Sequence, residues 1–305
     1  MKKQVPDAEV HFLTKKSFTN IVESNPYIDK IITLGNDWNT MIDALKTEQY
    51  DYIIDLHHNL RTLRIKRTLK VKSFSFDKLN IQKWLLTALK INVLPKLHIV
   101  DRNLSTLSSF GVLNDGKGLD YFIPDKDKVK DKDIPASHHF GYIGIVIGAA
   151  LETKKLPVHR LKELCSKINY PIILLGGPED KANGDVIAAT DDIKIYNSCG
   201  KFNLNESADL VRRSKLIITH DTGLMHIAAA LKKPIVSIWG NTVPEFGMYP
   251  YQSTPVFHAQ VRNLSCRPCS KIGHNTCPKG HFECMLKQQT KEISEQITSL
   301  FYREN

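Results

Sequence analysis

The stretch HDTGLMHIAAALKKPIVSIWG, residues 220–240, places a group of polar residues between an apolar strand and an apolar helix. The residues before it, 216–219, are typical of a short buried strand, and the apolar residues after it recur at helical spacing until a proline ends the run. Thr222 therefore falls near the N-cap of the predicted helix. Asp221 precedes this cap, and His226 follows it by one helical turn.

A helix start exposes unpaired backbone N–H groups and the positive end of the helix dipole. Thr222, Gly223 and Leu224 would thus form an anion site at the carboxyl end of a strand, with His226 beside it. An ordinary cap followed by a surface histidine produces the same pattern. This stretch alone does not separate the two interpretations.

The composition is that of a globular chain of about two domains, with 42% hydrophobic and 24% charged residues among 305. The first residues, MKKQVPDAEVHFL, lack the apolar core of a signal peptide, and no stretch approaches the roughly 18 apolar residues that a membrane span needs. We therefore expect a cytoplasmic protein. The net charge of +10 favours an anionic partner, either a nucleic acid, an acidic membrane surface or a phosphorylated substrate. A solvated lysine-rich surface has the same composition.

The six cysteines fall into two groups. Cys165 and Cys199 lie singly in apolar settings, which is typical of small core residues. The other four occur in CRPCSKIGHNTCPKGHFEC with two interleaved histidines, and they are Cys266, Cys269, Cys277 and Cys284. Grouped cytosolic thiols indicate tetrahedral zinc, although only the first pair has the usual two-residue gap. Reduced cysteines packing a compact loop are the alternative.

The first part of the chain alternates short apolar strands with amphipathic runs, which predicts a parallel sheet. The strands are expected at 8–14, 29–35, 50–57 and 72–76, and the helices at 16–24, 38–48, 59–69 and 81–91. A charged stretch without periodicity, 123–139, interrupts the pattern and is expected to be the interdomain linker. The first domain is thus predicted to span residues 1–135.

A second strand and helix series follows, so we expect two doubly wound α/β domains. Its strands are expected at 142–148, 171–177, 193–199, 216–221 and 235–240, and its helices at 158–168, 179–189, 204–213 and from 223. Each strand ends in Gly and polar residues, and ligands bind at that edge of such sheets. This recurrence favours a site for a phosphorylated ligand. Neither a GxGxxG nor a GxxxxGK[ST] sequence is present, which argues against a nicotinamide dehydrogenase and a P-loop enzyme.

The segment HDTGLMHIAAALKKPIVSIWG resembles the Asp-Thr-Gly-x-x-His segment of glycosyltransferase family 9, the lipopolysaccharide heptosyltransferases. LLGGPED, SCGKFNLNESADLVRRSKLIITHDTG, CRPCSKIGHNTCPKGHFECM and DYIIDLHHNLRTLRIKR are similar to further family segments. The resemblance implies a GT-B fold, in which two Rossmann-like domains of parallel sheet face a cleft. The nucleotide-sugar domain would span 136–285, and a final helix in 286–305 would pack back on the first domain.

The resemblance implies an inverting transferase that moves heptose from ADP-L-glycero-D-manno-heptose to the inner core of lipopolysaccharide, without metal or cofactor. The diphosphate would bind Thr222 and Gly223 at the helix start. The remaining donor-binding residues implied are Lys154, Lys155, Glu179, Asp180, Asp221 and His226. The acceptor, of lipid A-Kdo type, implies a location at the inner face of the inner membrane with peripheral membrane contact.

The acceptor would be bound from the other side of the cleft by Asn59, Arg61 and Arg64, since a phosphate-rich acceptor favours bidentate cations. Arg64 and Lys66 are equally typical of solvated helix-face charges, and Asp55 of a helix cap. The family opens with a strand and a Gly-Asp loop whose aspartate is the catalytic base, and this first strand and base have no counterpart in MKKQVPDAEVHFLTKK. The family's lysine segment carries Trp-Pro, where this chain has Leu156-Pro157.

Three alternatives follow. The chain could be a truncated or non-catalytic relative that binds a nucleotide sugar, since loss of a general base typically costs about 10²- to 10⁴-fold in rate. It could use another nucleotide sugar, because glycine-rich strand ends select phosphates and not the base. A basic, zinc-stapled nucleic-acid-binding protein is disfavoured, because the cations are scattered and aromatic stacking residues lack regular spacing. We therefore expect no nucleic-acid partner.

Overall fold

The computed structural model describes residues 1–35 and 37–302, and the chain divides into two compact units. The first unit comprises residues 1–80 and 97–117, and the second comprises 81–96 and 118–305. The sequence predicted a division near residue 135. The predicted linker instead belongs to the second unit, because Val129 and Ile134 are buried in its core and the Val129 N–H donates to Asp209 Oδ2 at 3.0 Å.

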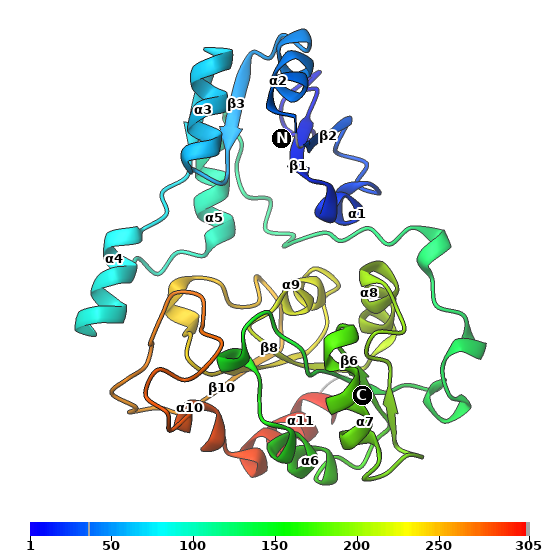
Figure 1. The fold of residues 1–305 in the computed structure, drawn as a ribbon. Coiled ribbons are helices and arrows are strands. Elements are labelled where there is room, and N and C mark those ends of the chain that lie inside the picture. The colour runs from blue at the N-terminus through cyan, green and yellow to red at the C-terminus, as the bar shows by residue number, and fades with distance from the viewer. Residues whose placement is uncertain (36, 303–305) are drawn as a thin grey trace. The chain divides into compact units, whose positions relative to one another are not determined.

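The second unit is built on one six-stranded parallel sheet with the strand order β10-β9-β8-β5-β6-β7 (Figure 1). These strands are β5 (Ile143–Val146), β6 (Ile172–Leu175), β7 (Ile195–Asn197), β8 (Leu216–His220), β9 (Ile235–Trp239) and β10 (Val256–Gln260). Every residue of β5, β6, β8 and β9 is buried, which explains their continuous apolar sequences. Five of the strands were predicted, and β10 was not.

Helices cover both faces of this sheet, as a doubly wound fold requires (Figure 1). The helices are α6 (Val158–Ser166), α7 (Lys181–Ala188), α8 (Leu204–Arg213), α9 (Gly223–Ala230), α10 (Glu283–Leu286) and α11 (Thr290–Tyr302). One core packs α6, α7 and α11 against the sheet, and the other packs α8 and α9. The carboxyl ends of all six strands consequently lie along one edge, where a ligand site is expected.

The C-terminal helix α11 packs on the second unit's own core. Ile293, Ile297 and Leu300 are buried there, and the rings of Tyr170 and Phe301 meet edge to face at 4.6 Å. The sequence predicted that this helix packs back on the first domain; the apolar face that is buried in the structure is occupied by the sheet and by α6.

The first unit contains two separate parallel pairs, β1 with β2 and β3 with β4, where the sequence predicted one doubly wound sheet. Its elements are β1 (His11–Lys15), α1 (Thr19–Val22), β2 (Lys30–Leu34), α2 (Trp38–Thr47), β3 (Tyr52–Asp55), α3 (Leu60–Leu69), β4 (Lys72–Ser75) and α5 (Ile99–Leu104). Met41, Ile42 and Leu45 of α2 form a small core with Ile65 of α3. Side chains of β1 and β2 pack against this core, and no ladder joins the two pairs within the described residues.

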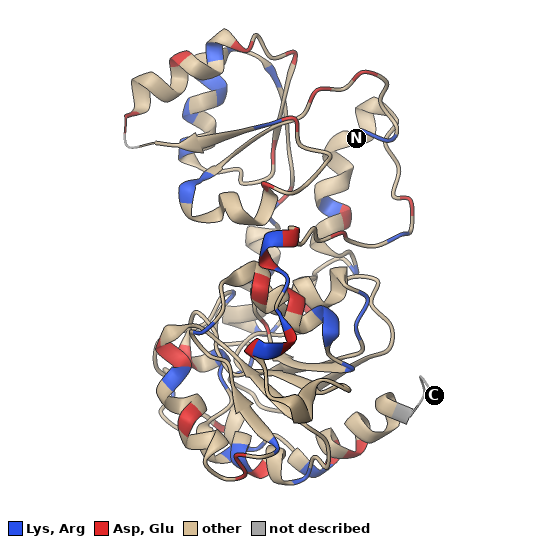
Figure 2. Cartoon of the chain, turned by 90° about the vertical axis from the view of Figure 1, so that its right-hand side faces the viewer, with Lys and Arg blue, Asp and Glu red and all other residues tan. Residues whose placement is uncertain are grey.

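A short helix, α4 (Asn80–Trp84), begins the excursion into the second unit and continues as a π-helical turn, Leu85–Leu89. Basic and acidic residues are interspersed along most helices and turns of the chain (Figure 2), whereas α3 carries Lys and Arg without Asp or Glu. Among the described residues, no helix is long and apolar enough to cross a bilayer.

Candidate functional site

The start of α9 presents free backbone donors, as the sequence predicted. Thr222 is the N-cap residue, in an extended conformation with φ −141° and ψ 172°. Within the described chain its hydroxyl makes no capping bond to the helix, and lies 3.4 Å from Thr219 Oγ1 instead. Gly223 is exposed, and a Cβ there would meet open space. The first N–H groups of α9 are thus left available to an anion.

Asp221 anchors a cation beside this helix start. Its Oδ2 lies 2.8 Å from Lys154 Nζ and accepts the Thr242 hydroxyl at 3.0 Å. Lys154 Nζ also donates to the Asp221 carbonyl at 3.2 Å, so the ammonium is fixed by two oxygens of one residue. The structure therefore brings together Lys154, Asp221 and Thr222 from the loops after β5 and β8.

Two histidines of the HDTGLMH segment are neutral. Burial lowers the pKa of His226, the Asp221 carboxylate opposes this shift and the Lys154 ammonium adds to it. Burial lowers the pKa of His220 to about 4. His220 was not predicted as a site residue. Its Nε2 accepts the Leu156 N–H at 2.9 Å and so connects the loop that carries Lys154 and Lys155 to β8.

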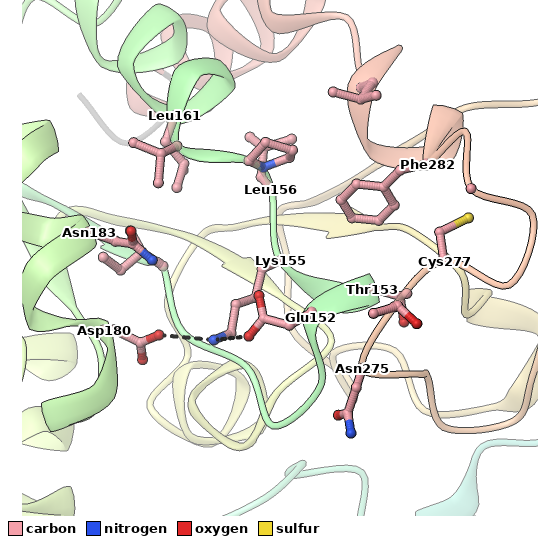
Figure 3. A pocket seen from close by; sticks show the side chains of 16 residues that line it. Glu152, Thr153, Lys155, Leu156, Leu161, Asp180, Asn183, Asn275, Cys277 and Phe282 are labelled. Carbon is pink, nitrogen blue, oxygen red and sulfur yellow. Dashed lines mark hydrogen bonds and ion pairs between the residues drawn. The ribbon is translucent and has the colours of Figure 1, made fainter.

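Lys155 lines a cavity of about 600 Å³ (Figure 3). All residues that line this cavity lie between positions 147 and 286. The Lys155 ammonium lies 2.8 Å from Glu152 Oε1 and 3.2 Å from Asp180 Oδ1. Burial by itself lowers the pKa of Lys155, but the two carboxylates reverse this and raise it above its usual value. Asp180 also accepts the Gly177 N–H at 3.1 Å and is buried, whereas Glu179 is exposed.

A polar network that the sequence did not predict joins the strand ends to the loop after β10. The Thr153 hydroxyl lies 3.2 Å from Asn241 Oδ1 and 3.0 Å from the His274 carbonyl, and it accepts the His274 N–H at 2.8 Å. Half-buried Arg267 donates to the Thr242 carbonyl at 3.0 Å. No local pattern indicates these contacts, because their partners lie far apart in the chain.

The three predicted acceptor residues have different roles in α3. Asn59 is the N-cap, and its side chain accepts the Thr62 N–H at 3.0 Å in a capping box. Arg64 stacks on the Trp38 ring at 4.1 Å. Arg61 is exposed in the first turn, and of the three it is the one whose side chain makes no hydrogen bond, ion pair or ring contact with the described part of the chain.

Asp55 ends β3 in a buried ion pair with Lys66, 2.8 Å apart. It also accepts the N–H groups of His57 and His58, at 3.1 and 2.7 Å. Burial opposes ionisation, but Lys66 and these donors outweigh it and hold the pKa of Asp55 at about 2. Asp55 thus organises the turn before α3, and Lys66 is not a solvated surface charge.

The grouped cysteines are free thiols. Cys269 Sγ donates to the Cys266 carbonyl at 3.1 Å, and Cys266 Sγ lies 3.7 Å from His281 Nε2. Burial raises the pKa of Cys284 to about 12. No three His, Cys, Asp or Glu side chains of residues 1–35 and 37–302 are arranged to hold a metal ion. Cys165 and Cys199 are core residues, as predicted.

The sequence model of glycosyltransferase family 9 (heptosyltransferase) matches residues 38–281. The chain belongs to this family. Among curated relatives, it is 34% identical to lipooligosaccharide heptosyltransferase 2 of Haemophilus influenzae over 34% of this chain and 32% of that protein. It is 28% identical to lipopolysaccharide heptosyltransferase 1 of Campylobacter coli over 79% and 78% of the two chains. The first relatives are matched over a third to a half of their own length.

Solved structures share the fold. The Escherichia coli ADP-heptose heptosyltransferase II structure superposes with a TM-score of 0.75 over 99% of this chain and 92% of that one, at 18% identity. The E. coli heptosyltransferase WaaC with ADP gives 0.65 over 98% and 92%, at 15% identity. The family model confirms the family assignment, and these structures confirm the GT-B class of fold inferred from the sequence.

Proposed function

We propose that this chain is an inverting glycosyltransferase that moves heptose from ADP-L-glycero-D-manno-heptose to the inner core of lipopolysaccharide. The observation that carries the proposal is the uncapped start of α9 beside the Lys154 and Asp221 ion pair. Family membership supports the reaction class. Structures of WaaC with ADP and with ADP-2-deoxy-2-fluoro heptose support the donor class.

In this proposal the donor diphosphate accepts hydrogen bonds from the N–H groups of Gly223 and Leu224 and from the Lys154 ammonium. The bond between the anomeric carbon and the diphosphate oxygen breaks, and its electron pair stays on ADP. Donors aimed at this developing charge stabilise the transition state. The acceptor hydroxyl attacks the opposite face of the sugar and gives its proton to a base. Neutral His226 is suited to contact the sugar or the phosphate as a hydrogen-bonding group.

The nucleoside would extend toward the cavity at Lys155. Glu179 is the better candidate for ribose hydroxyls, because it is exposed, whereas Asp180 already uses both carboxylate oxygens on Lys155 and the Gly177 N–H. Asp180 and Lys155 then serve to hold the loops after β5 and β6 in place. In the first unit, Arg61 is the cation best placed for the acceptor, because Arg64 is engaged by Trp38.

A second candidate is a nucleotide-sugar-binding protein without turnover. Asp55 is the buried carboxylate at the end of β3, and with a pKa of about 2 and an ion pair to Lys66 it is poorly suited to remove a proton from a hydroxyl. This observation argues against Asp55 as the base and is the reason for weighing donor binding without turnover as the second candidate. Measurement of donor binding and of turnover separates the two candidates.

Calorimetric titration of the 305-residue chain with ADP-heptose, ADP, UDP-glucose and GDP-mannose tests the donor site. We expect selective binding of the ADP ligands, and at least a roughly tenfold weaker affinity in Asp221→Ala and His226→Ala, since charge-assisted contacts contribute about 1.5–3 kcal/mol. Glu295→Ala, which removes an exposed carboxylate on α11, is the matched control. Wild-type affinity in both site variants would refute the assignment. ADP release with a lipid A-Kdo acceptor then distinguishes transferase from binder.

A further inference from the structure

The segment 81–96 carries exposed apolar side chains on a firmly held backbone. On its inner side Leu86 is buried against Val243 and Phe246, and Leu94 packs against the same cluster. The segment therefore belongs to the second unit, and its exposed side chains are presented by an anchored helix and turn.

Lys90 provides the second attachment of the segment 81–96 to the rest of the second unit. Its ammonium donates to the carbonyls of Cys266 and Pro268, at 3.2 and 2.8 Å, and to the Thr87 carbonyl at 2.7 Å. The loop 261–282 is thereby joined to the segment 81–96. We call these two stretches together the basic apolar face.

Six large apolar side chains on this face are exposed to solvent. They are Ile81 (74% exposed), Trp84 (55%), Leu89, Ile91, Val93 and Ile272 (66%). Single exposed apolar residues are ordinary, but a cluster on two joined segments marks a surface that is covered by a partner.

The charge of this face identifies the chemistry of that partner. Residues 81–96 and 261–282 contain seven of the 42 Lys and Arg of the chain and none of its 32 Asp and Glu. Residues 56–76 of the first unit also carry Lys and Arg without Asp or Glu, whereas along most other helices and turns the two signs are interspersed (Figure 2). Lys96, Arg262 and Lys279 are exposed. Cations around apolar side chains, with a tryptophan among them, are typical of a surface that lies in the head-group region of an anionic bilayer.

We propose that the basic apolar face docks this protein on a bilayer rich in anionic lipid, with Ile81 and Trp84 entering the boundary between head groups and acyl chains. The proposal deepens the proposed function, because it explains how a chain without a spanning helix in its described part meets a lipid-anchored acceptor. The exposed apolar and basic side chains on which it rests are not among the residues assigned to the donor.

Sedimentation with vesicles tests the proposal, using phosphatidylcholine alone and phosphatidylcholine with 30% phosphatidylglycerol. We expect the full chain to bind the anionic vesicles and not the neutral ones. Ile81→Ser/Trp84→Ser should weaken binding by roughly tenfold or more, because apolar burial is lost. Phe140→Ser/Ile193→Ser removes two exposed apolar side chains elsewhere and should leave binding unchanged.

Charge reversal provides a second comparison. Each Lys or Arg near an anionic surface strengthens binding about fivefold, so Lys96→Glu/Lys279→Glu should reduce it by more than tenfold. Lys132→Glu/Lys291→Glu, which reverses two exposed charges outside the face, should weaken vesicle binding much less. Equal losses in the two variants would show a general charge effect and overturn the proposed surface.

Trp84 gives a direct readout of depth. Brominated lipid should quench its fluorescence on binding, and Trp84→Phe should bind vesicles but lose this quenching. Vesicle binding that survives Ile81→Ser/Trp84→Ser overturns the proposal, as does a wild-type dimer that this variant dissociates, since the occupant is then a second copy. These vesicles contain no acceptor, so failure here is distinct from failure to bind ADP-heptose.

Discussion

Protonation of His220 should loosen the second unit, since this ring is 1% exposed and its Nε2 accepts the Leu156 N–H. Protonation of Nε2 would abolish that bond and place a charge in the core. Burial lowers the pKa of His220 to about 4, against 6.5 for an unperturbed ring. Between these pH values the unfolded chain binds a proton that the folded chain does not. The contribution of His220 to the free energy of unfolding is therefore fully present above pH 6.5 and is lost as the pH decreases toward 4.

The magnitude follows from the two pKa values. Between pH 7.5 and pH 5.0 the linkage relation gives a loss of about 2 kcal/mol in the free energy of unfolding from this one histidine. His220→Gln retains an acceptor but does not titrate. We expect the variant to be less stable than wild type at pH 7.5, and the difference to narrow by about 2 kcal/mol at pH 5.0.

Urea unfolding at both pH values measures this difference. In a Trp38→Phe/Trp84→Phe background, the emission of Trp239 reports the second unit, because its ring is buried in β9. The exposed His159, changed to Gln, is the matched control and should show no narrowing. A cost of His220→Gln that is the same at pH 5.0 and pH 7.5 would show that His220 is not held neutral by burial and would refute the reasoning.

Two further predictions concern the first unit. Arg61→Ala should weaken binding of a Kdo-bearing lipid A roughly tenfold while donor affinity stays unchanged, with Arg67→Ala at the other end of α3 as the control; a change in donor affinity alone would place the acceptor elsewhere. Amide hydrogens of β1 to β4 should exchange faster than those of β5, β8 and β9, because the first unit's strands form two-stranded sheets over a small core. Equal protection in the two units would contradict this.

The positions of β5, β6, β8 and β9 could be predicted because fully buried parallel strands are continuous apolar runs. The strand β10 was missed because VFHAQ contains a histidine and a glutamine. The structure accommodates His258 there through Ser237 Oγ, 2.6 Å from its Nδ1. A polar residue in a strand is tolerated where a neighbouring strand supplies its partner, and sequence patterns do not show that partner.

The start of α9 was predictable because capping is local: strand, cap and helix lie within one stretch. The different ion-pair partners of Lys154 and Lys155 were not predictable, since these partners lie up to 67 residues away. Lys154 pairs with Asp221, and Lys155 pairs with Glu152 and Asp180. Lys154 ends a 3-10 turn and Lys155 follows it in an extended conformation, so the two neighbouring lysines reach different loops.

The charges of α3 were predicted less well for the same reason. A helix-face pattern gives a direction but no partner, so Lys66 and Arg64 were equally typical of solvated charges. The structure pairs Lys66 with buried Asp55 and stacks Arg64 on Trp38. Both contacts join α3 to a neighbouring element, and they leave Arg61 as the cation in the first turn of this helix that a ligand can engage without breaking an interaction.

The donor-site lysines are already paired before any ligand binds, and this determines what a diphosphate gains there. Two ammonium groups face three carboxylates, of Glu152, Asp180 and Asp221, so net charge does not attract an anion to the site. The attraction comes from the uncapped N–H groups of α9, whose direction is fixed by the backbone. Asp221 then serves to orient Lys154 beside those N–H groups. Its removal should weaken donor binding even though it removes a negative charge, because an unheld ammonium loses its position at the helix start.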